Sequence, residues 1–291
     1  MPSTLDSTVP FFSTAQLKTL HEQGYLVVPD LLSIEAVEAG RLALRQLIEQ
    51  AADAPEQMEW RLPAESGKSA TIRGKNSPLM IETEAGWDPR GQTAEEIDRH
   101  VRKFMGFQNE HPWFSSILAE TEPIRRAIST ILGEAPILFQ DMALVKPARI
   151  GREKPWHQDN AYFSVTPLEA VVGVWIALDD ADIENGCMHV IPGGHRGGGL
   201  KHHHTFDCEI VPDRLDPADA VPIPVPAGGA LFFYGLLPHQ TPPNRSDKRR
   251  RALQFHYRSA DSQVVDKSFY DKVFCEPDGT PASCKAARES S

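Results

Sequence analysis

His157 and Asp159 are the first residues of this sequence whose types and spacing suggest chemistry. One residue separates them, so both side chains can face a single metal ion when the backbone is extended or turned. His239 offers a third ligand at the end of an apolar stretch. Two imidazoles and one carboxylate leave three positions of an ion open, which is the arrangement of non-haem Fe(II) oxygenases. Because a lone His-X-Asp string occurs by chance in many proteins, the predicted metal site depends on His239.

The long separation of the two histidines requires a fold that brings them together. His239 follows His157 by 82 residues, and closing a loop of that length costs about 4 kcal/mol in chain entropy. In the second half of the chain, short apolar stretches are separated by Gly, Pro, Asp and Asn turns. This pattern predicts an antiparallel β-sandwich or jelly roll. The apolar stretches are 137–145, 171–178, 188–191, 221–225, 230–234 and 252–257.

The first half of the chain has the periodicity of α-helices. Thr93 and Glu96 have the spacing of a capping box, and Ile97, Val101 and Phe104 follow at helical intervals. Similar signals begin three other predicted helices, at Ser13, Ser33 and Thr121. We therefore predict helices that pack outside a β core.

These patterns predict one domain over residues 14–260, with a helical part at 14–133 and a β core at about 135–258. The expected fold class is mainly β with flanking helices, built on a jelly-roll core. Residues 53–92 are polar and rich in Gly and Pro, so we expect a long loop or lid there. Residues 261–291 are expected to form a loose C-terminal extension.

Composition excludes several classes of protein. The net charge is −10 and the pI is about 5.6, which disfavours nucleic-acid binding because that function needs a basic face. No apolar run approaches the roughly 18 residues that a membrane span requires, and the first residues do not resemble a signal peptide. The four cysteines form no Cys-X-X-Cys pair. We therefore expect reduced thiols in a cytoplasmic protein.

Several motifs together give the sequence a specific resemblance. They are 24–27 (GYLV), 156–159 (WHQD), 173–180 (GVWIALDD), 184–187 (ENGC) and 191–195 (IPGGH), followed by His239, Arg250 and 255–256 (FH). In type, order and spacing, the chain resembles the phytanoyl-CoA dioxygenase family of Fe(II)- and 2-oxoglutarate-dependent oxygenases over roughly residues 14–260. The resemblance implies a double-stranded β-helix (cupin-like) core, Fe(II), 2-oxoglutarate and O₂. Hydroxylation of a small organic molecule, with release of succinate and CO₂, is the expected reaction.

The resemblance also implies a 2-oxoglutarate site. Arg250, eleven residues after His239, corresponds to the family arginine that binds the far carboxylate. Its planar guanidinium suits bidentate carboxylate recognition. Thr241 corresponds to a hydroxyl that shares this contact, and Trp175 and Gln140 correspond to pocket-lining residues. The carboxylate ligand is present at Asp159, which disfavours halogenation because related halogenases lack it.

One alternative stays open at this point. The chain could be a cupin-like divalent-metal protein without 2-oxoglutarate turnover, such as an isomerase, a hydrolase or a sensor. Arg250 distinguishes this alternative from a 2-oxoglutarate-dependent oxygenase, because a protein without 2-oxoglutarate turnover needs no residue to bind the far carboxylate. Arg249 and Arg251 flank Arg250 and would point to the other face of a strand. If the strand register differs by one residue, the 2-oxoglutarate-binding arginine is one of these two instead.

The substrate pocket is predicted from neighbours of the candidate ligands. Trp156, Tyr162 and Phe163 are expected to border it, which favours an apolar or ring-bearing small molecule. Arg73 lies in the expected lid, where it could contact 2-oxoglutarate or an anionic substrate. His195 is interpreted as a structural turn residue and the triple histidine 202–204 as a solvated loop. The sequence does not identify the substrate or the oligomeric state.

Overall fold

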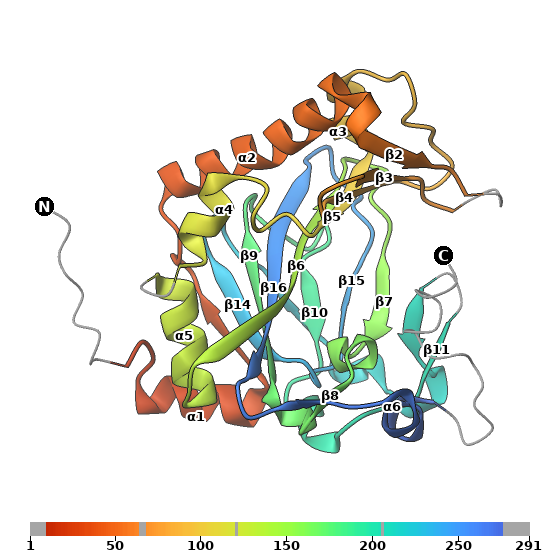
Figure 1. Cartoon of the computed structure of the whole chain (residues 1–291). Helices are drawn as coiled ribbons and strands as arrows, with labels where there is room; N and C mark the ends of the chain where they lie inside the picture. Colours follow the sequence, from red (N-terminus) through yellow and green to blue (C-terminus); the bar gives the residue numbers. More distant parts are fainter. Residues whose placement is uncertain (1–9, 64–67, 120–121, 205–206, 276–291) are drawn as a thin grey trace, which may run out of the picture.

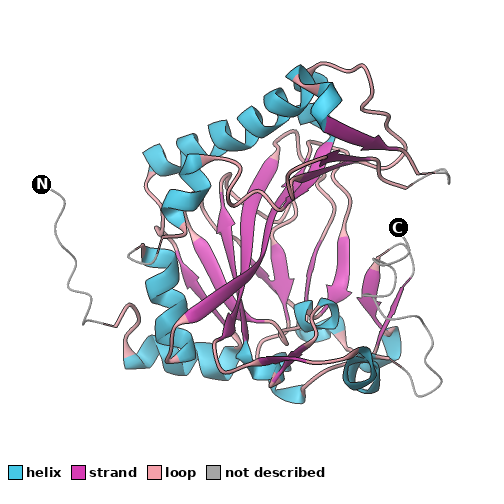
Figure 2. Cartoon of the chain, in the orientation of Figure 1, coloured by secondary structure: helices cyan, strands magenta, loops and turns pink. Residues whose placement is uncertain are grey.

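The computed structural model describes residues 10–63, 68–119, 122–204 and 207–275. Two antiparallel sheets face each other, and side chains of both form one apolar cluster between them. Helices cover the other face of the larger sheet (Figure 1, Figure 2). The predicted mainly β fold, with flanking helices and a cupin-like double-stranded β-helix core, is confirmed. The sheets do not close into a barrel.

In the described residues, the larger sheet has the strand order β1-β14-β9-β16-β6-β5-β4-β3-β2. These strands are, in that order, Tyr25–Val28, Ala230–Tyr234, Val171–Ala177, Arg250–Ser259, Pro136–Lys146, Val101–Met105, Met80–Thr83, Thr71–Gly74 and Met58–Arg61. The smaller sheet has the order β13-β10-β15-β7. Its strands are Val221–Ile223, Met188–Val190, His239–Thr241 and Lys154–His157. Two short pairs are β11 (His202–His204) with β12 (Cys208–Ile210), and β8 (Val165–Thr166) with β17 (Gln263–Val264).

Three predicted helices begin at their signals, Ser13, Ser33 and Thr93. The fourth follows Glu122 as its N-cap, and Thr121 lies outside the described residues. Ser13 with Gln16 and Thr93 with Glu96 form complete capping boxes. Apolar faces of the helices before residue 133 pack with one face of the larger sheet in the main core cluster. No helix in the described ranges combines the length and apolarity needed to cross a membrane. The helices are α1 (Thr14–Gln23), α2 (Ile34–Asp53), α3 (Ala94–His100), α4 (Pro112–Ile117), α5 (Pro123–Leu132) and α6 (Lys267–Phe274).

The segment 53–92 differs from the expected loop. It contributes β2, β3 and β4, which extend the larger sheet beyond β5. Each of these strands has only four residues, too few for alternation of apolar and polar residues to be distinctive. The prediction of a loop or lid is therefore wrong for these three strands.

A β-bulge explains why β5 was mistaken for part of a helix. Val101 and Phe104 are both fully buried, and they are three residues apart, as on a helix. The pairing of β4 with β5 shifts register at this point, because Glu82 pairs with Lys103 while the next residue of β4 pairs with Val101. Arg102 is the extra residue of the bulge. The bulge thus gives a strand the apparent period of a helix.

The C-terminal extension is partly ordered. Helix α6 buries Tyr270 and Phe274 in a small apolar cluster with Cys208, so the expectation of a loose extension is wrong for residues 267–274. Residues 276–291 lie outside the described part of the chain. Cys187 and Cys275 are free and buried, whereas Cys208 is disulfide-bonded. The expectation of reduced thiols is therefore wrong at Cys208.

Candidate metal centre

The smaller sheet brings the two histidines together. His157 ends β7 and pairs directly with His239, which begins β15. Asp159 begins the short 3-10 helix η2 (Asp159–Tyr162) immediately after β7. One ligand atom from each of the three buried residues lies within 4.8 Å of the others. The Nε2 atoms of His157 and His239 lie 3.3 and 3.8 Å from oxygens of Asp159.

Backbone carbonyls orient both imidazoles. Nδ1 of His157 lies 2.8 Å from the carbonyl oxygen of Pro155, and Nδ1 of His239 lies 2.9 Å from that of Leu237. A carbonyl oxygen can only accept, so each Nδ1 carries a proton, and Nε2 is the ring atom that can bind a metal. Burial, reinforced by His157, lowers the pKa of His239 to about 3. His239 is therefore a neutral imidazole, as a metal ligand must be.

Two residues of β16 hold the carboxylate of Asp159. Nε2 of His256 lies 2.8 Å from Oδ2, and the amide of Gln254 donates to the same oxygen at 3.1 Å. Burial by itself would raise the pKa of Asp159, but His256, His239 and the hydrogen bonds outweigh it and hold the pKa well below its usual range. Asp159 is therefore an anion whose Oδ2 is already fixed. This leaves Oδ1, which faces His157, free to bind a metal.

We predict that His256→Leu weakens Fe(II) binding by about 10- to 100-fold, the usual cost of losing a hydrogen-bond partner of a metal ligand. The dissociation constant would be measured by anaerobic Fe(II) titration. Tyr257→Phe serves as the control, because Tyr257 follows His256 on β16, lies in the helix-facing core and has a buried hydroxyl without a hydrogen-bond partner in the described residues. Unchanged Fe(II) affinity in His256→Leu would show that Asp159 needs no such support.

Gln158, between the first two candidate ligands, ties their loop to the loops around it. Its amide nitrogen donates to the carbonyl oxygens of Gly198 and Leu236, and its Oε1 accepts from the amide of Leu200. Its backbone N–H donates to Nε2 of His202 at 3.0 Å. Gln158 is fully buried. It therefore fixes the backbone from which His157 and Asp159 project.

His202 corrects an expectation. The triple histidine was expected to be a solvated loop, but His202 is only 2% exposed. Its Nδ1 lies 2.8 Å from the carbonyl oxygen of Leu200, and burial lowers its pKa to about 3. His202 is therefore neutral, with Nε2 free to accept the N–H of Gln158. His195 stacks on Tyr234 near α1, away from the candidate ligands.

We expect Gln158→Leu to lower the free energy of unfolding by about 2–4 kcal/mol, because two carbonyls and one N–H would lose their buried partner. Urea unfolding monitored by circular dichroism measures this change. Gln240→Leu provides the comparison, since Gln240 is half-buried and neighbours His239 on β15. A loss below about 0.5 kcal/mol, the usual range for surface changes, would mean that the Gln158 hydrogen bonds do not support the loop.

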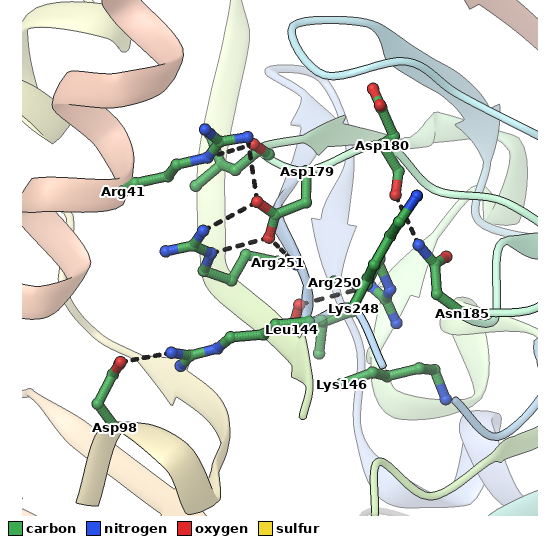
Figure 3. Close-up of polar contacts among 12 residues, drawn as sticks. Arg41, Asp98, Leu144, Lys146, Asp179, Asp180, Asn185, Lys248, Arg250 and Arg251 are labelled. Atoms are coloured by element: carbon green, nitrogen blue, oxygen red, sulfur yellow. Dashed lines mark hydrogen bonds and ion pairs between the residues drawn. The ribbon is translucent and has the colours of Figure 1, made fainter. Parts of the chain in front are cut away.

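Within the part of the chain that the structure describes, Arg250 is a buried cation without a carboxylate partner. It begins β16 and points to the side of the sheet away from Arg41 (Figure 3). It is 1% exposed, and its Nη1 makes a long hydrogen bond of 3.4 Å to the carbonyl oxygen of Leu144. Its Nε has no partner among the described residues, and its guanidinium lies 5.3 Å from the centre of the Trp175 ring. Burial lowers the pKa of Arg250 to about 10, so it stays charged.

The flanking arginines are both paired. Arg249 lies 2.5 Å from Asp98 of α3, and Arg251 makes two hydrogen bonds of 2.8 and 2.9 Å to Asp179. Figure 3 shows these partners on the side of Arg41 and α2. Of the three consecutive arginines, only Arg250 therefore lacks a carboxylate partner in the described residues, and its guanidinium can bind a ligand between the sheets.

Lys146 is a second buried cation that sequence reasoning missed. It pairs with Arg250 across β6 and β16, and its Nζ donates to the carbonyl oxygen of Thr241 at 3.2 Å. Burial and the nearby Arg250 hold the pKa of Lys146 well below its usual range. Arg250 is therefore the stronger candidate for binding a carboxylate.

The other expected 2-oxoglutarate contacts face the same space. Trp175 pairs with Gln254, and Gln140 pairs with His256, so both point to the side of the larger sheet from which Asp159 is held. Thr241 lies two residues after His239 on β15 and therefore shares its face. The structure thus collects these side chains around the candidate ligands.

The expected pocket residues are divided. Phe163 packs edge-on against the ring of His256 at 4.8 Å, and Tyr162 lies edge-on to His157 at 6.1 Å. Trp156 is half-buried at a bulge of β7. Arg73 lies on β3, four strands from β16 in the sheet, or about 19 Å at the usual strand spacing. Arg73 is therefore not brought to the candidate ligands.

The comparisons with known proteins agree with this geometry. The profile of the family "Phytanoyl-CoA dioxygenase (PhyH)" matches residues 20–252. The chain belongs to the phytanoyl-CoA dioxygenase family. It is 27% identical over 265 residues to phytanoyl-CoA dioxygenase domain-containing protein 1 of Danio rerio, covering 85% of this chain and 90% of that protein. The predicted family is therefore confirmed.

Solved structures extend the comparison. EvdO2 from Micromonospora carbonacea var. aurantiaca, complexed with 2-oxoglutarate, is 25% identical with a TM-score of 0.58, covering 91% of this chain and 95% of that one. EctD from S. alaskensis with bound Fe is 17% identical with a TM-score of 0.62, covering 91% and 83%, and shows the shared fold. The prediction of an oxygenase that uses Fe(II), 2-oxoglutarate and O₂ is confirmed at the level of the family.

Proposed function

We propose that this protein is a 2-oxoglutarate-dependent hydroxylase of a small organic molecule. In this proposal, His157, Asp159 and His239 hold Fe(II), and Arg250 binds the far carboxylate of 2-oxoglutarate beside Thr241. Membership of the phytanoyl-CoA dioxygenase family supports the class of reaction. The observation that carries the site is the buried Arg250, which has a free Nε and paired neighbours on both sides. An unpaired buried charge is costly, and a carboxylate ligand would offset that cost.

The donor set fits the metal. Two imidazoles and one carboxylate are the ligands of non-haem Fe(II) sites with open positions, and all three side chains point at one region. Bound there with 2-oxoglutarate, iron would supply an oxidant made from O₂ that attacks a C–H bond, with release of succinate and CO₂. The chain orients this chemistry through the carbonyls behind each histidine and through His256 behind Asp159. Trp175 and Phe163 add apolar bulk that keeps water from the site.

A screen of small organic molecules tests hydroxylation. With Fe(II), 2-oxoglutarate and ¹⁸O₂, a substrate should give succinate and a product that carries one labelled oxygen atom. A product that has lost two hydrogens without gaining oxygen would show desaturation instead, and the hydroxylase assignment would be wrong. The cupin-like alternative without 2-oxoglutarate turnover predicts no succinate with any compound.

We further propose a cytoplasmic location and a small-molecule substrate rather than a nucleic acid or a membrane surface. The acidic net charge supports the second statement. The disulfide at Cys208 does not favour the first, because cytosolic disulfides are uncommon. Cell fractionation with an antibody against the protein tests the location.

A further inference from the structure

Three cations gather between the sheets beside the candidate metal centre. We call Arg102, Lys103 and Lys154 the basic cluster. Arg102 and Lys103 lie 2.5 and 2.7 Å from Glu82, and Lys154 lies 2.6 Å from Asp207. The two groups influence each other, since Lys103 and Arg102 both act on the charge of Lys154. Glu84 also acts on Arg102 but is itself paired with Arg152 at 3.3 Å. With that pair included, four positive charges meet three negative ones in the described residues, so one positive charge remains unmatched.

Two β-bulges place these cations there. Arg102 is the extra residue in the pairing of β4 with β5. In β7, the register shift after His157 sets Lys154 opposite Thr241, on the face that carries the candidate ligands. Bulges redirect side chains and are frequent near active sites. Without its bulge, Lys154 would alternate to the face opposite His157.

The basic cluster is close to the candidate ligands and is not sealed. Nζ of Lys154 lies 2.5 Å from the hydroxyl of Tyr162, whose ring packs edge-on against His157. Arg102 and Lys103 each keep 22% of the side chain exposed, and Lys154 keeps 27%. By contrast, Arg250 is 1% exposed. An anion arriving from solvent can therefore reach the basic cluster while 2-oxoglutarate occupies Arg250.

An apolar row lies beside the basic cluster and leads to β16. Met80, Met105 and Met142 pair in one row across β4, β5 and β6, and the row continues to Gln254. All three methionines are half-buried, and Lys103 lies on the same face. Flexible thioether side chains adapt to varied apolar ligands. The row therefore suits the apolar part of a molecule that reaches from the basic cluster toward Asp159.

We propose that the primary substrate carries one anionic group, a carboxylate or a phosphate, on an apolar body. The basic cluster binds the anionic group, and the methionine row contacts the body. A hydrogen bond to a charged group contributes about 1.5–3 kcal/mol, so the charge should improve binding by at least about 10-fold. The proposal rests on the proposed function, because it concerns the substrate of the same site.

The test uses pairs of probes that differ in charge. Octanoate with octanamide and 3-phenylpropanoate with 3-phenylpropanamide form the carboxylate arm, and phenyl phosphate with phenol forms the phosphate arm. Each is titrated by calorimetry into anaerobic protein loaded with Fe(II), with and without 2-oxoglutarate. We expect the anion to bind at least about 10-fold more tightly in one arm or both. Equal affinities within all pairs would overturn the proposal.

Variants of the basic cluster test whether it causes the tighter binding of the anionic probes. Arg102→Gln and Lys103→Gln, each of which removes one cation and leaves Glu82 with one partner, should abolish this preference without weakening 2-oxoglutarate binding. Arg249→Gln is the matched control. Arg249 is 21% exposed and lies 2.5 Å from one carboxylate, as Arg102 does, but on the outer face. A preference that survives in both cluster variants would overturn the proposal.

The two proposals fail in different ways. If the cluster variants lose 2-oxoglutarate binding and Arg250→Ala keeps it, the cluster is the co-substrate site and the substrate proposal is wrong. If wild-type protein binds no 2-oxoglutarate, the proposed function fails, while the titrations without 2-oxoglutarate still decide whether the basic cluster recognises anions.

Discussion

Alanine at His157, Asp159 or His239 is expected to reduce Fe(II)-dependent succinate formation by about 100-fold or more. Losing an outer partner of a metal ligand already costs 10- to 100-fold, and losing a ligand should cost more. The fold should survive, because the three side chains converge on one point and belong to none of the apolar core clusters. Succinate release, measured with Fe(II) in excess, and circular dichroism check the two parts of this prediction.

His189→Ala is the control for the metal ligands. His189 precedes Val190, which pairs with His239, so His189 points to the opposite face of the smaller sheet. Its removal should leave succinate formation within about 2-fold of wild type. Full activity in any one of the three ligand variants would contradict the metal assignment.

Arg250→Ala should raise the dissociation constant of 2-oxoglutarate by at least about 10-fold, because a bidentate pair of charged hydrogen bonds is lost. Titration of 2-oxoglutarate into the anaerobic Fe(II) protein measures the change. Arg249→Ala and Arg251→Ala should have little effect, since both side chains are paired with carboxylates on the outer face. A sharp loss of 2-oxoglutarate affinity in Arg249→Ala or Arg251→Ala, with normal affinity in Arg250→Ala, would mean that 2-oxoglutarate binds on the outer face of the larger sheet.

Replacement of Arg250 by an apolar residue should stabilise the ligand-free fold even though it weakens 2-oxoglutarate binding. Replacing a buried charge with an apolar side chain of similar volume is often neutral or stabilising. Arg250→Met should therefore raise the free energy of unfolding of the ligand-free protein by about 1 kcal/mol or more, while it weakens 2-oxoglutarate binding. A destabilised Arg250→Met protein would show that Arg250 has a structural role.

If none of the variants Arg249→Ala, Arg250→Ala and Arg251→Ala alters 2-oxoglutarate binding, the cupin-like alternative becomes the better account.

The candidate metal ligands could be predicted from the sequence, but the residues that hydrogen-bond to Asp159 could not. His157, Asp159 and His239 could be proposed because their residue types are unusual at strand ends. The roles of His256 and Gln254 could not be predicted, because their contacts with Asp159 span 97 and 95 residues. His256 was detectable as part of the 255–256 motif, and both residues are polar and alternate with the apolar residues of β16. Alternation predicts a shared face but not the partner on it.

The misassigned elements have local physical causes. The bulge at Arg102 gave β5 the apparent period of a helix, and the four-residue strands β2 to β4 are too short to show alternation. A run of histidines predicts a solvated loop, whereas His202 is buried and accepts a hydrogen bond from the distant Gln158. In each case, pairing with another segment outweighed the local pattern.

The central claim is that this chain consumes 2-oxoglutarate at an iron held by the His157, Asp159 and His239 side chains. The most direct measurement is the conversion of 2-oxoglutarate to succinate by the wild-type protein, with Fe(II) and O₂ each supplied or withheld. We predict succinate only when both are present, and none above background with Asp159→Ala. Succinate that forms equally without Fe(II), or equally with Asp159→Ala, would contradict the account, as would unchanged 2-oxoglutarate under the complete conditions.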